Sequence, residues 1–312
     1  MTKVMNSVEI RVLGQMRSGN HAIIAWLHSL YPKKSICFLN NVQHGDFDPF
    51  ENYMQMELTG MDECSEAEIL RNRARDVLIY SYEDRNCLAE SNLDLVSSVY
   101  DERFEARREE YVGASARRFD IVIVRDPFNC LASRITLLRK RGALGGLANM
   151  SLIRDNWKAV ARKAIDLEKT GRRDQITINY NRWVFDDVYR EHLSKLLMAQ
   201  SAGTVPTTPP EYGGGSSFIE PLTFGDLFRK RRKLLSIKRW FRFNEYLRRL
   251  IPRLRINKGD LLTRWTMLSG DDEYRELFRD PDVLSLSEQL FGEIPGTREF
   301  VRNVCGSTHT SA

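Results

Sequence analysis

Two glycines separated by four residues stand directly after a short apolar run, in the stretch VLGQMRSGNH from Val12 to His21. Gly14 and Gly19 have the spacing of a loop whose backbone N–H groups surround a phosphate at the start of a helix. The lysine and the serine or threonine that follow in nucleoside triphosphatases are replaced here by Asn20 and His21. The pattern predicts an anion site of another kind; the alternative is a plain strand-to-helix turn.

Side chains within this stretch add to the predicted anion site. Arg17 supplies a fixed cation, and Ser18 and Asn20 supply side-chain donors. We expect His21, in the first turn of the following helix, to contact a phosphate rather than act as a base. The helix dipole disfavours a charged imidazole there unless an anion offsets it.

A second group of polar residues follows the apolar run 119–124, in the stretch IVIVRDPFNCLASRI. Pro127 suits the first turn of a helix, which would begin just after Arg125 and carry Ser133. A bidentate guanidinium and a hydroxyl could then meet at one phosphate. The alternative is a surface pair between Arg125 and Asp126, with Ser133 on a solvated face.

Alternating apolar runs and helical patterns predict the elements that position these residues. Short continuous runs typical of buried parallel strands are Val8–Leu13, Val77–Tyr82, Phe119–Val124 and Gln175–Tyr180. Helical patterns cover His21–Leu30, Ser151–Thr170 and Asn181–Gln200. We therefore expect a doubly wound α/β fold with a central parallel sheet flanked by helices, and a ligand at the carboxyl ends of the strands.

Together the two motifs resemble those of the sulfotransferase family. QMRSGNH resembles its 5′-phosphosulfate loop, commonly Pro-Lys/Arg-Ser-Gly-Thr/Asn-Thr-Trp, and RDPFNCLAS resembles its 3′-phosphate motif, with the Arg-to-Ser spacing of eight intact. ITINYNRWVFDD is similar to the later strand that ends in Tyr-Glu-Asp-Leu, and RINKGDLLTRW to the C-terminal Arg-Lys-Gly loop and the Trp beyond it. The matches run from Val8 to about Trp265, most of the chain.

The resemblance implies a single domain over residues 1–312, with a P-loop-type three-layer sandwich. It implies that PAPS (3′-phosphoadenosine 5′-phosphosulfate) is the cofactor, that PAP (3′,5′-adenosine bisphosphate) is the product, and that no metal is required. The expected activity is transfer of a sulfuryl group to a hydroxyl or amine of a small molecule, in natural product biosynthesis. This last step is an analogy.

The resemblance also implies roles for particular residues. Arg17 would stabilise the leaving phosphate at the bridging oxygen. The expected cofactor-binding residues are Arg17, Ser18, Gly19, Asn20, His21, Arg125, Ser133, Tyr180, Asn257, Lys258 and Gly259. The chain departs from the family at four positions: Met16 replaces the proline, Ala22 the stacking tryptophan, Asn181 the acid after Tyr180, and Asn257 the arginine of the C-terminal loop. Whether Arg255 takes over from that arginine stays open.

The acceptor needs a base to take its proton, and two residues are candidates. Glu83 follows the run VLIYSY, within a residue or so of the place where the family's cytosolic enzymes carry a histidine, and carbohydrate-modifying relatives use a glutamate; it is the first choice. His44, in NVQHGDF, is the second. The alternative for Glu83 is a solvated carboxylate paired with Arg85.

Charge is unevenly distributed along the 312 residues, whose formal net charge is +5. The stretch 201–217 is predicted to be a flexible loop, and 218–258 a basic helical cap or flap. The segment from Arg229 to Lys258 contains thirteen lysines and arginines and a single acidic residue, Glu245. This segment could be a solvated face packed through its apolar side, a flap over the polyanionic cofactor, or a surface for a membrane or an acidic partner.

Composition indicates the kind of protein and its compartment. No apolar run reaches the ~18 residues of a membrane span, and the five cysteines show no C-x-x-C pair. We expect a soluble cytoplasmic protein with a small-molecule acceptor, no nucleic-acid partner and no stable membrane insertion; its oligomeric state stays open. The alternatives to a sulfotransferase are a P-loop phosphotransferase that uses ATP and a non-catalytic binder of an anionic ligand.

Overall fold

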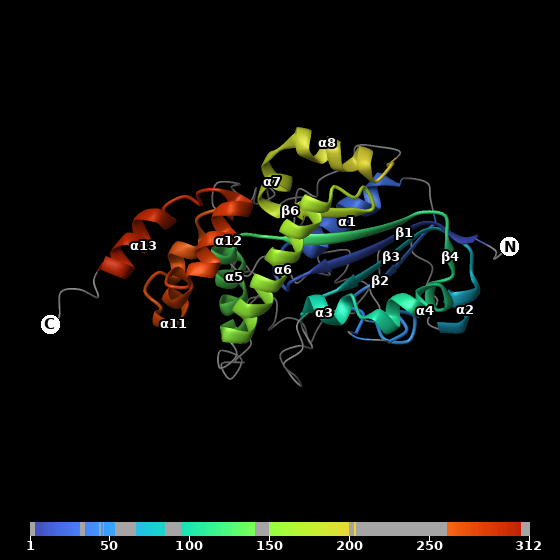
Figure 1. The fold of residues 1–312 in the computed structure, drawn as a ribbon, viewed down its shortest axis with the longest axis horizontal. Helices are drawn as coiled ribbons and strands as arrows, with labels where there is room; N and C mark the ends of the chain where they lie inside the picture. Colours follow the sequence, from blue (N-terminus) through green and yellow to red (C-terminus); the bar gives the residue numbers. More distant parts are fainter. Residues whose placement is uncertain are drawn as a thin grey trace, which may run out of the picture.

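A parallel sheet forms the centre of the computed structural model (Figure 1), in the order β2-β3-β1-β5-β6. The structure describes residues 4–31, 35–43, 45, 47–53, 67–84, 95–140, 150–199, 203 and 261–306. The five strands are β1 (Val4–Gly14), β2 (Ile36–Leu39), β3 (Arg75–Tyr82), β5 (Arg118–Val124) and β6 (Gln175–Asn179). A two-residue strand, β4 (Ala114–Ser115), pairs with the start of β1. This α/β architecture with a central parallel sheet confirms the coarse fold prediction.

Helices cover both faces of the sheet, and Figure 1 shows α7 and α8 above it and α3 and α4 below it. The first layer consists of α1 (Asn20–Leu30), α7 (Tyr180–Phe185) and α8 (Asp187–Leu196). The second contains α2 (Ala67–Asn72), α3 (Leu95–Val99), α4 (Glu102–Val112) and α6 (Met150–Thr170). Successive side chains of a strand point to opposite faces of the sheet, so each strand packs against both helix layers. Ile10 and Val12 of β1 pack towards α1, and Leu13 packs on the opposite face.

A third apolar cluster joins α5 (Pro127–Lys140) to α6 and to the C-terminal elements. These are η5 (Arg264–Leu268), α11 (Asp272–Arg275), η6 (Glu276–Phe278), α12 (Pro281–Phe291) and α13 (Thr297–Gly306). Phe128 of α5 stacks on Phe278, with ring centroids 4.5 Å apart, and the Tyr274 hydroxyl donates to the Phe128 carbonyl at 2.8 Å. The C-terminal part of the chain is thus packed against the helix that carries Ser133.

The predicted elements agree with the structure except at one helix and one strand. The pattern over Asn181–Gln200 predicts one helix, which is wrong: α7 ends at Phe185 and α8 begins at Asp187. Asp186 between them is extended (φ −111°, ψ 104°), and its carboxylate caps α8 by accepting from the Tyr189 N–H. The predicted strand Gln175–Tyr180 is one residue too long, because Tyr180 begins α7. Further elements were not predicted: β2, β4, α2, α3, α4 and the C-terminal η5, α11, η6, α12 and α13.

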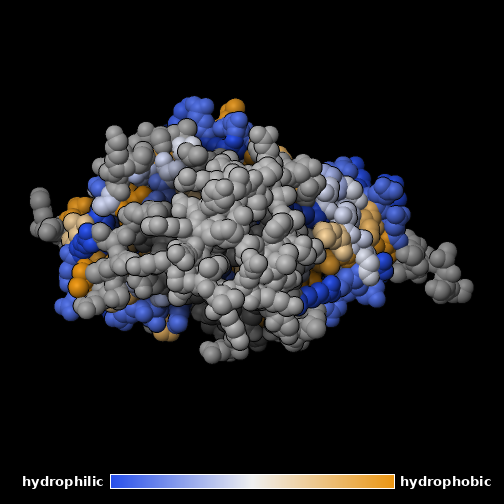
Figure 2. Space-filling view, turned by 180° about the vertical axis from the view of Figure 1, so that it is seen from behind, coloured by the Kyte–Doolittle hydropathy of each residue, from blue (hydrophilic) through white to orange (hydrophobic). Residues whose placement is uncertain are grey.

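The described surface is mainly hydrophilic in the view of Figure 2, where hydrophobic residues appear as separate small areas. The exposed large apolar side chains come from several elements: Val4, Phe47, Ile69, Phe185, Val188, Met198 and Met267. Within the part of the chain that the structure describes, none of the helices has the length and apolar character that a bilayer crossing requires.

A buried ionic cluster lies between β1 and α4, on the face of the sheet opposite α1. Glu9 accepts from Arg108 at 2.7 Å and from the Tyr80 hydroxyl at 2.8 Å. Arg11 donates two parallel bonds to Asp120, at 2.9 and 3.0 Å. Burial raises the pKa of Glu9, but Arg108 and the other donors outweigh it, so that its pKa is lowered. Removing one member of such a cluster leaves a buried charge uncompensated.

We expect Glu9→Gln to lower the free energy of unfolding by about 3 kcal/mol at neutral pH, because Arg108 and Arg118 then lose the buried carboxylate that they share. The effect should shrink as the pH falls below about 4.5, where the unfolded carboxylate becomes protonated first and the advantage of the folded state is lost. Urea unfolding at several pH values measures both. Glu109→Gln, an exposed change on the same helix, is the control and should cost no more than about 0.5 kcal/mol.

Candidate anion-binding site

The glycine loop between β1 and α1 contains two residues in left-handed conformation, Arg17 (φ 75°) and Gly19 (φ 99°). Both glycines of the motif are also packed too tightly for a side chain. A Cβ on Gly14 would lie 2.0 Å from Asn20 Oδ1, and one on Gly19 would lie 2.1 Å from the ring of Tyr180. The spacing of the glycines therefore reflects two close approaches of the loop to its surroundings.

The amide of Asn20 holds this loop together. Its Nδ2 donates to the Gly14 carbonyl at 3.0 Å and to Glu83 Oε1 at 2.8 Å. Its Oδ1 accepts from the Ser18 hydroxyl at 2.7 Å. The side chains of Ser18 and Asn20 are thus engaged inside the loop, so an anion there would be bound chiefly by backbone N–H groups of the loop and of the first turn of α1.

The two motifs meet because β1 and β5 are neighbours in the sheet, with Gly14 opposite Ile123. Arg17 Nε donates to the Ser133 hydroxyl at 3.1 Å, and Arg125 Nη1 donates to the Arg17 carbonyl at 3.1 Å. Two guanidinium groups and one hydroxyl are therefore gathered between the loop and α5. A site with two such cations is suited to a multiply charged anion.

Arg125 has an unsatisfied hydrogen-bond donor in the described structure. It is 6% exposed, and its buried Nη2 has no hydrogen-bond partner in the described structure. Its guanidinium carbon lies 5.1 Å from the centroid of the Tyr180 ring, and that ring stacks in turn on Trp183 at 5.9 Å. An unpartnered buried N–H is costly, and a bound phosphate oxygen would satisfy it.

Asp126 does not form the surface pair with Arg125 that the alternative interpretation predicts. Arg125, Asp126 and Ser133 are all buried, so that alternative is wrong. Burial raises the pKa of Asp126, although Arg125 and donors from Asn129 and Asn181 oppose this effect. The carboxylate accepts from Asn129 N at 2.8 Å and from Asn181 Nδ2 at 3.1 Å, and so fixes the start of α5 against α7.

Asn129 extends this connection to the C-terminal part of the chain. Its Nδ2 donates to the Leu262 carbonyl at 3.0 Å, and its Oδ1 accepts from the Trp265 N–H at 3.1 Å. Sequence reasoning missed Asn129 and treated Asn181 only as a departure from an acidic residue. The role of Asn129 could not be predicted from residue spacing, because its partners Leu262 and Trp265 are distant in the chain.

Glu83 lies at the end of β3, beside the loop, and is half-buried. Burial raises its pKa and exceeds the opposing effects of the Asn20 hydrogen bond and of Arg134 and Arg17 nearby. A carboxylate with a raised pKa is a stronger proton acceptor than an ordinary one, and this carboxylate lies beside a cationic site. Arg85, its proposed surface partner, lies outside the described residues.

Several predicted residues also fall outside the described part of the chain. These are His44, Asn257, Lys258 and Gly259, with Arg255, the loop 201–217 except Gly203, and the basic segment 218–258. In the described ranges, no group of three or more His, Cys, Asp or Glu side chains is placed to hold a metal ion.

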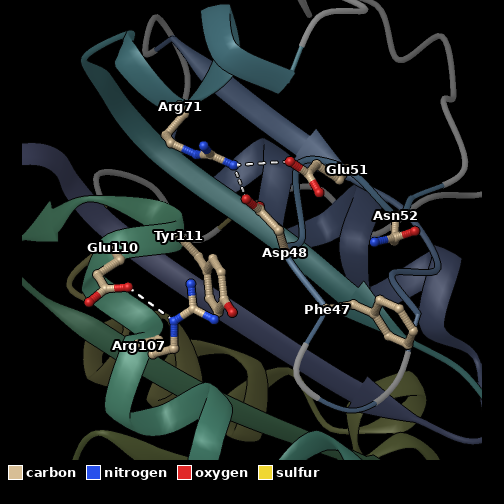
Figure 3. Close-up of a pocket in the computed structure, with 8 residues that line it drawn as sticks. All are labelled: Phe47, Asp48, Glu51, Asn52, Arg71, Arg107, Glu110 and Tyr111. Atoms are coloured by element: carbon tan, nitrogen blue, oxygen red, sulfur yellow. Dashed lines mark hydrogen bonds and ion pairs between the residues drawn. The ribbon is translucent and has the colours of Figure 1, made fainter.

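A separate hollow of about 470 Å³ lies between the segment 47–52, α2 and α4 (Figure 3). It is lined by Phe47, Asp48, Glu51, Asn52, Arg71, Arg107, Glu110 and Tyr111. Arg71 pairs with Asp48 and lies 3.5 Å from Glu51, while Arg107 pairs with Glu110 at 3.0 Å. Its two cations are thus already paired with carboxylates of the same hollow, and none of the lining residues belongs to the loop or to α5.

No family model, curated protein or solved structure matches the chain. Any function assigned to it therefore depends on its own residues and their geometry.

We expect Gly19→Ala to destabilise the protein more than Gly171→Ala, its matched control. Both glycines have positive φ, but a Cβ at Gly171 meets open space, whereas one at Gly19 meets Tyr180. The strain common to both should cost about 1 kcal/mol, and the contact with the ring should add about 2 kcal/mol to the Gly19 change. Chemical denaturation measures the difference; equal losses would contradict the packing described for the loop.

His21 should make stability depend on pH. Burial, and secondarily Arg17, lower its pKa from 6.5 to about 4. Between these values the unfolded chain binds a proton that the folded protein does not, so stability should fall as the pH drops from about 6.5 to about 4, by at most ~3 kcal/mol. His21→Gln should remove this part of the dependence, as measured by denaturation at each pH. His192→Gln, on the exposed face of α8, should leave it unchanged.

Proposed function

We propose that the chain transfers a sulfuryl group from PAPS to a hydroxyl or amine of a small molecule. The observation that carries this proposal is the meeting of the two motifs: Arg17, Ser133 and Arg125 form one connected group beside the glycine loop. The sequence resemblance assigns these two motifs to the two phosphate positions of one nucleotide. Their proximity across the β1–β5 pair supports the proposal, because the two phosphates belong to one ligand.

The residues present fit a doubly phosphorylated nucleotide. The loop and the first turn of α1 would hold the 5′-phosphosulfate through backbone N–H groups. Arg125, whose buried Nη2 lacks an acceptor, would hold the 3′-phosphate together with the Ser133 hydroxyl. Tyr180 lies against both the loop and Arg125, and would flank the nucleotide there.

Bound PAPS would supply an activated sulfuryl group and leave as PAP. Glu83 would accept the proton of the acceptor hydroxyl or amine as the new bond to sulfur forms. Arg17 would stabilise the negative charge that the bridging oxygen gains as its bond to sulfur breaks. The proton would thus be received by a carboxylate that follows β3, and the charge would be stabilised by a guanidinium of the loop.

An ATP-dependent phosphotransferase is less well supported. The amide of Asn20 occupies the position of the lysine in triphosphatase loops, and it is hydrogen-bonded within the loop. His21 stands where a hydroxyl would bind magnesium, and burial lowers its pKa to about 4, which keeps it neutral. A non-catalytic binder of an anion would use the same cations but would have no need of Glu83.

Calorimetric titration with PAP in EDTA tests this function. We expect micromolar binding that is lost with AMP, which lacks the 3′-phosphate. Arg125→Ala should weaken PAP binding by about 100-fold, because it removes a ground-state contact. Arg17→Ala should lower the turnover of PAPS by about 100-fold and change PAP affinity much less, because its contact strengthens in the transition state.

Arg173→Ala, which removes an exposed cation beyond α6, is the matched control and should alter neither quantity. Magnesium-dependent binding of ATP that is tighter than binding of PAP would refute the sulfotransferase proposal and favour the phosphotransferase. Tight binding of PAP with no turnover of PAPS, and no effect of Glu83→Gln, would favour the non-catalytic binder.

A further inference from the structure

A buried ion pair joins the residue after the end of β3 to α5, in contact with the backbone of the glycine loop. Asp84 and Arg134 are 0% and 1% exposed, and Arg134 Nη1 donates to Asp84 Oδ2. The other oxygen of Asp84 accepts from the backbone N–H of Met16 at 2.8 Å. The pair therefore holds the loop by its main chain, at the residue that precedes Arg17.

Arg17 is fixed from both sides by this arrangement. Its carbonyl accepts from Arg125, and the N–H of the residue before it is held by Asp84. Its left-handed φ of 75° is unfavourable for a residue with a side chain. Such a conformation persists only where the surrounding contacts hold it. Asp84, paired with Arg134, provides one of these contacts, and Arg125 provides the other.

The pair is poorly arranged as a source of stability. Arg134 Nε and Nη2 are buried without a hydrogen-bond partner in the described structure. A buried ion pair with unsatisfied donors is weak evidence for stabilisation, because the desolvation of its charges is not fully offset. The contact of this pair with the loop backbone is therefore a better guide to its role than any contribution to stability.

We propose that Asp84 and Arg134 are positioning residues that hold Arg17 in place for sulfuryl transfer while keeping the charge beside Glu83 balanced. This inference rests on the proposed function for its chemistry, but the restraint on the loop is independent of any ligand.

The charges around Glu83 explain why the two residues would act as a pair. Glu83 meets the amide of Asn20 from α1, Arg17 from the loop, Asp84 beside it on the chain and Arg134 from α5. Of these, Asp84 raises the pKa of Glu83, whereas Arg134 lowers it. Removal of one partner alone would move the pKa of the proposed base; removal of both charges together would move it least.

The test compares Asp84→Asn, Arg134→Gln and the double variant, in which an amide–amide pair can replace the ion pair without charge. Hydrogen exchange of the loop amides, residues 15–20, measures the restraint directly. Calorimetry with PAP and hydrolysis of PAPS, with water as the acceptor, measure binding and turnover. Arg108→Gln is the matched control, because it breaks a buried ion pair in the cluster between β1 and α4.

Each single variant should speed loop exchange by about tenfold or more and lower turnover by about 10- to 100-fold, with PAP affinity changed by less than about fivefold. The double variant should recover most of both losses. The acid limb of the turnover profile should move to higher pH in Arg134→Gln and to lower pH in Asp84→Asn.

Unchanged loop exchange in both single variants would overturn the proposal. So would equal effects of Arg108→Gln on loop exchange and turnover, since the role would then be one of general stability. If the wild-type chain neither binds PAP nor hydrolyses PAPS, the proposed function fails, and the positioning of Arg17 for that reaction fails with it. The exchange measurement still shows separately whether the pair restrains the loop.

Discussion

The pairing of β1 with both β3 and β5 is the constraint on which the candidate site depends. Leu13 lies opposite Tyr82 on one side and opposite Val122 on the other, so that all three strands end at the same edge of the sheet. The residues that follow them are the glycine loop, the acidic pair after Tyr82, and Arg125. A slip of one residue in either register would turn the side chains of that strand to the opposite face and separate these groups.

Neutral amides, together with the Asp84–Arg134 ion pair, connect the parts of this edge. Asn20 joins the loop to β3, while Asn129 and Asn181 join α5 to the C-terminal part and to α7. An amide can donate and accept at once, so it connects backbone and carboxylate without adding a buried charge. The two cations of the site therefore need not serve as structural partners for these connections.

Much of the fold could be predicted because β1, β3, β5 and β6 are continuous apolar runs, which period and length identify. The four residues of β2 are too few for such a signal, and the break at Asp186 is a capping effect within a helical pattern. In the site, residues that lie close in the sequence were found from their spacing. The Asp84–Arg134 pair was not, because its members are 50 residues apart and meet only through the sheet.

The bonds from Asn129 to Leu262 and Trp265 bear on the order in which the protein is completed during synthesis. The start of α5, just after Arg125, carries Asn129, whose side-chain amide finds these partners in a segment made more than 130 residues later. The sheet can pair while the chain is still growing, but the buried amide of Asn129 has its partners only after residue 265 has left the ribosome. A nascent chain therefore has all five strands of the sheet before the start of α5 has its partners, and a chain that ends before residue 262 would lack both of these bonds beside the candidate site.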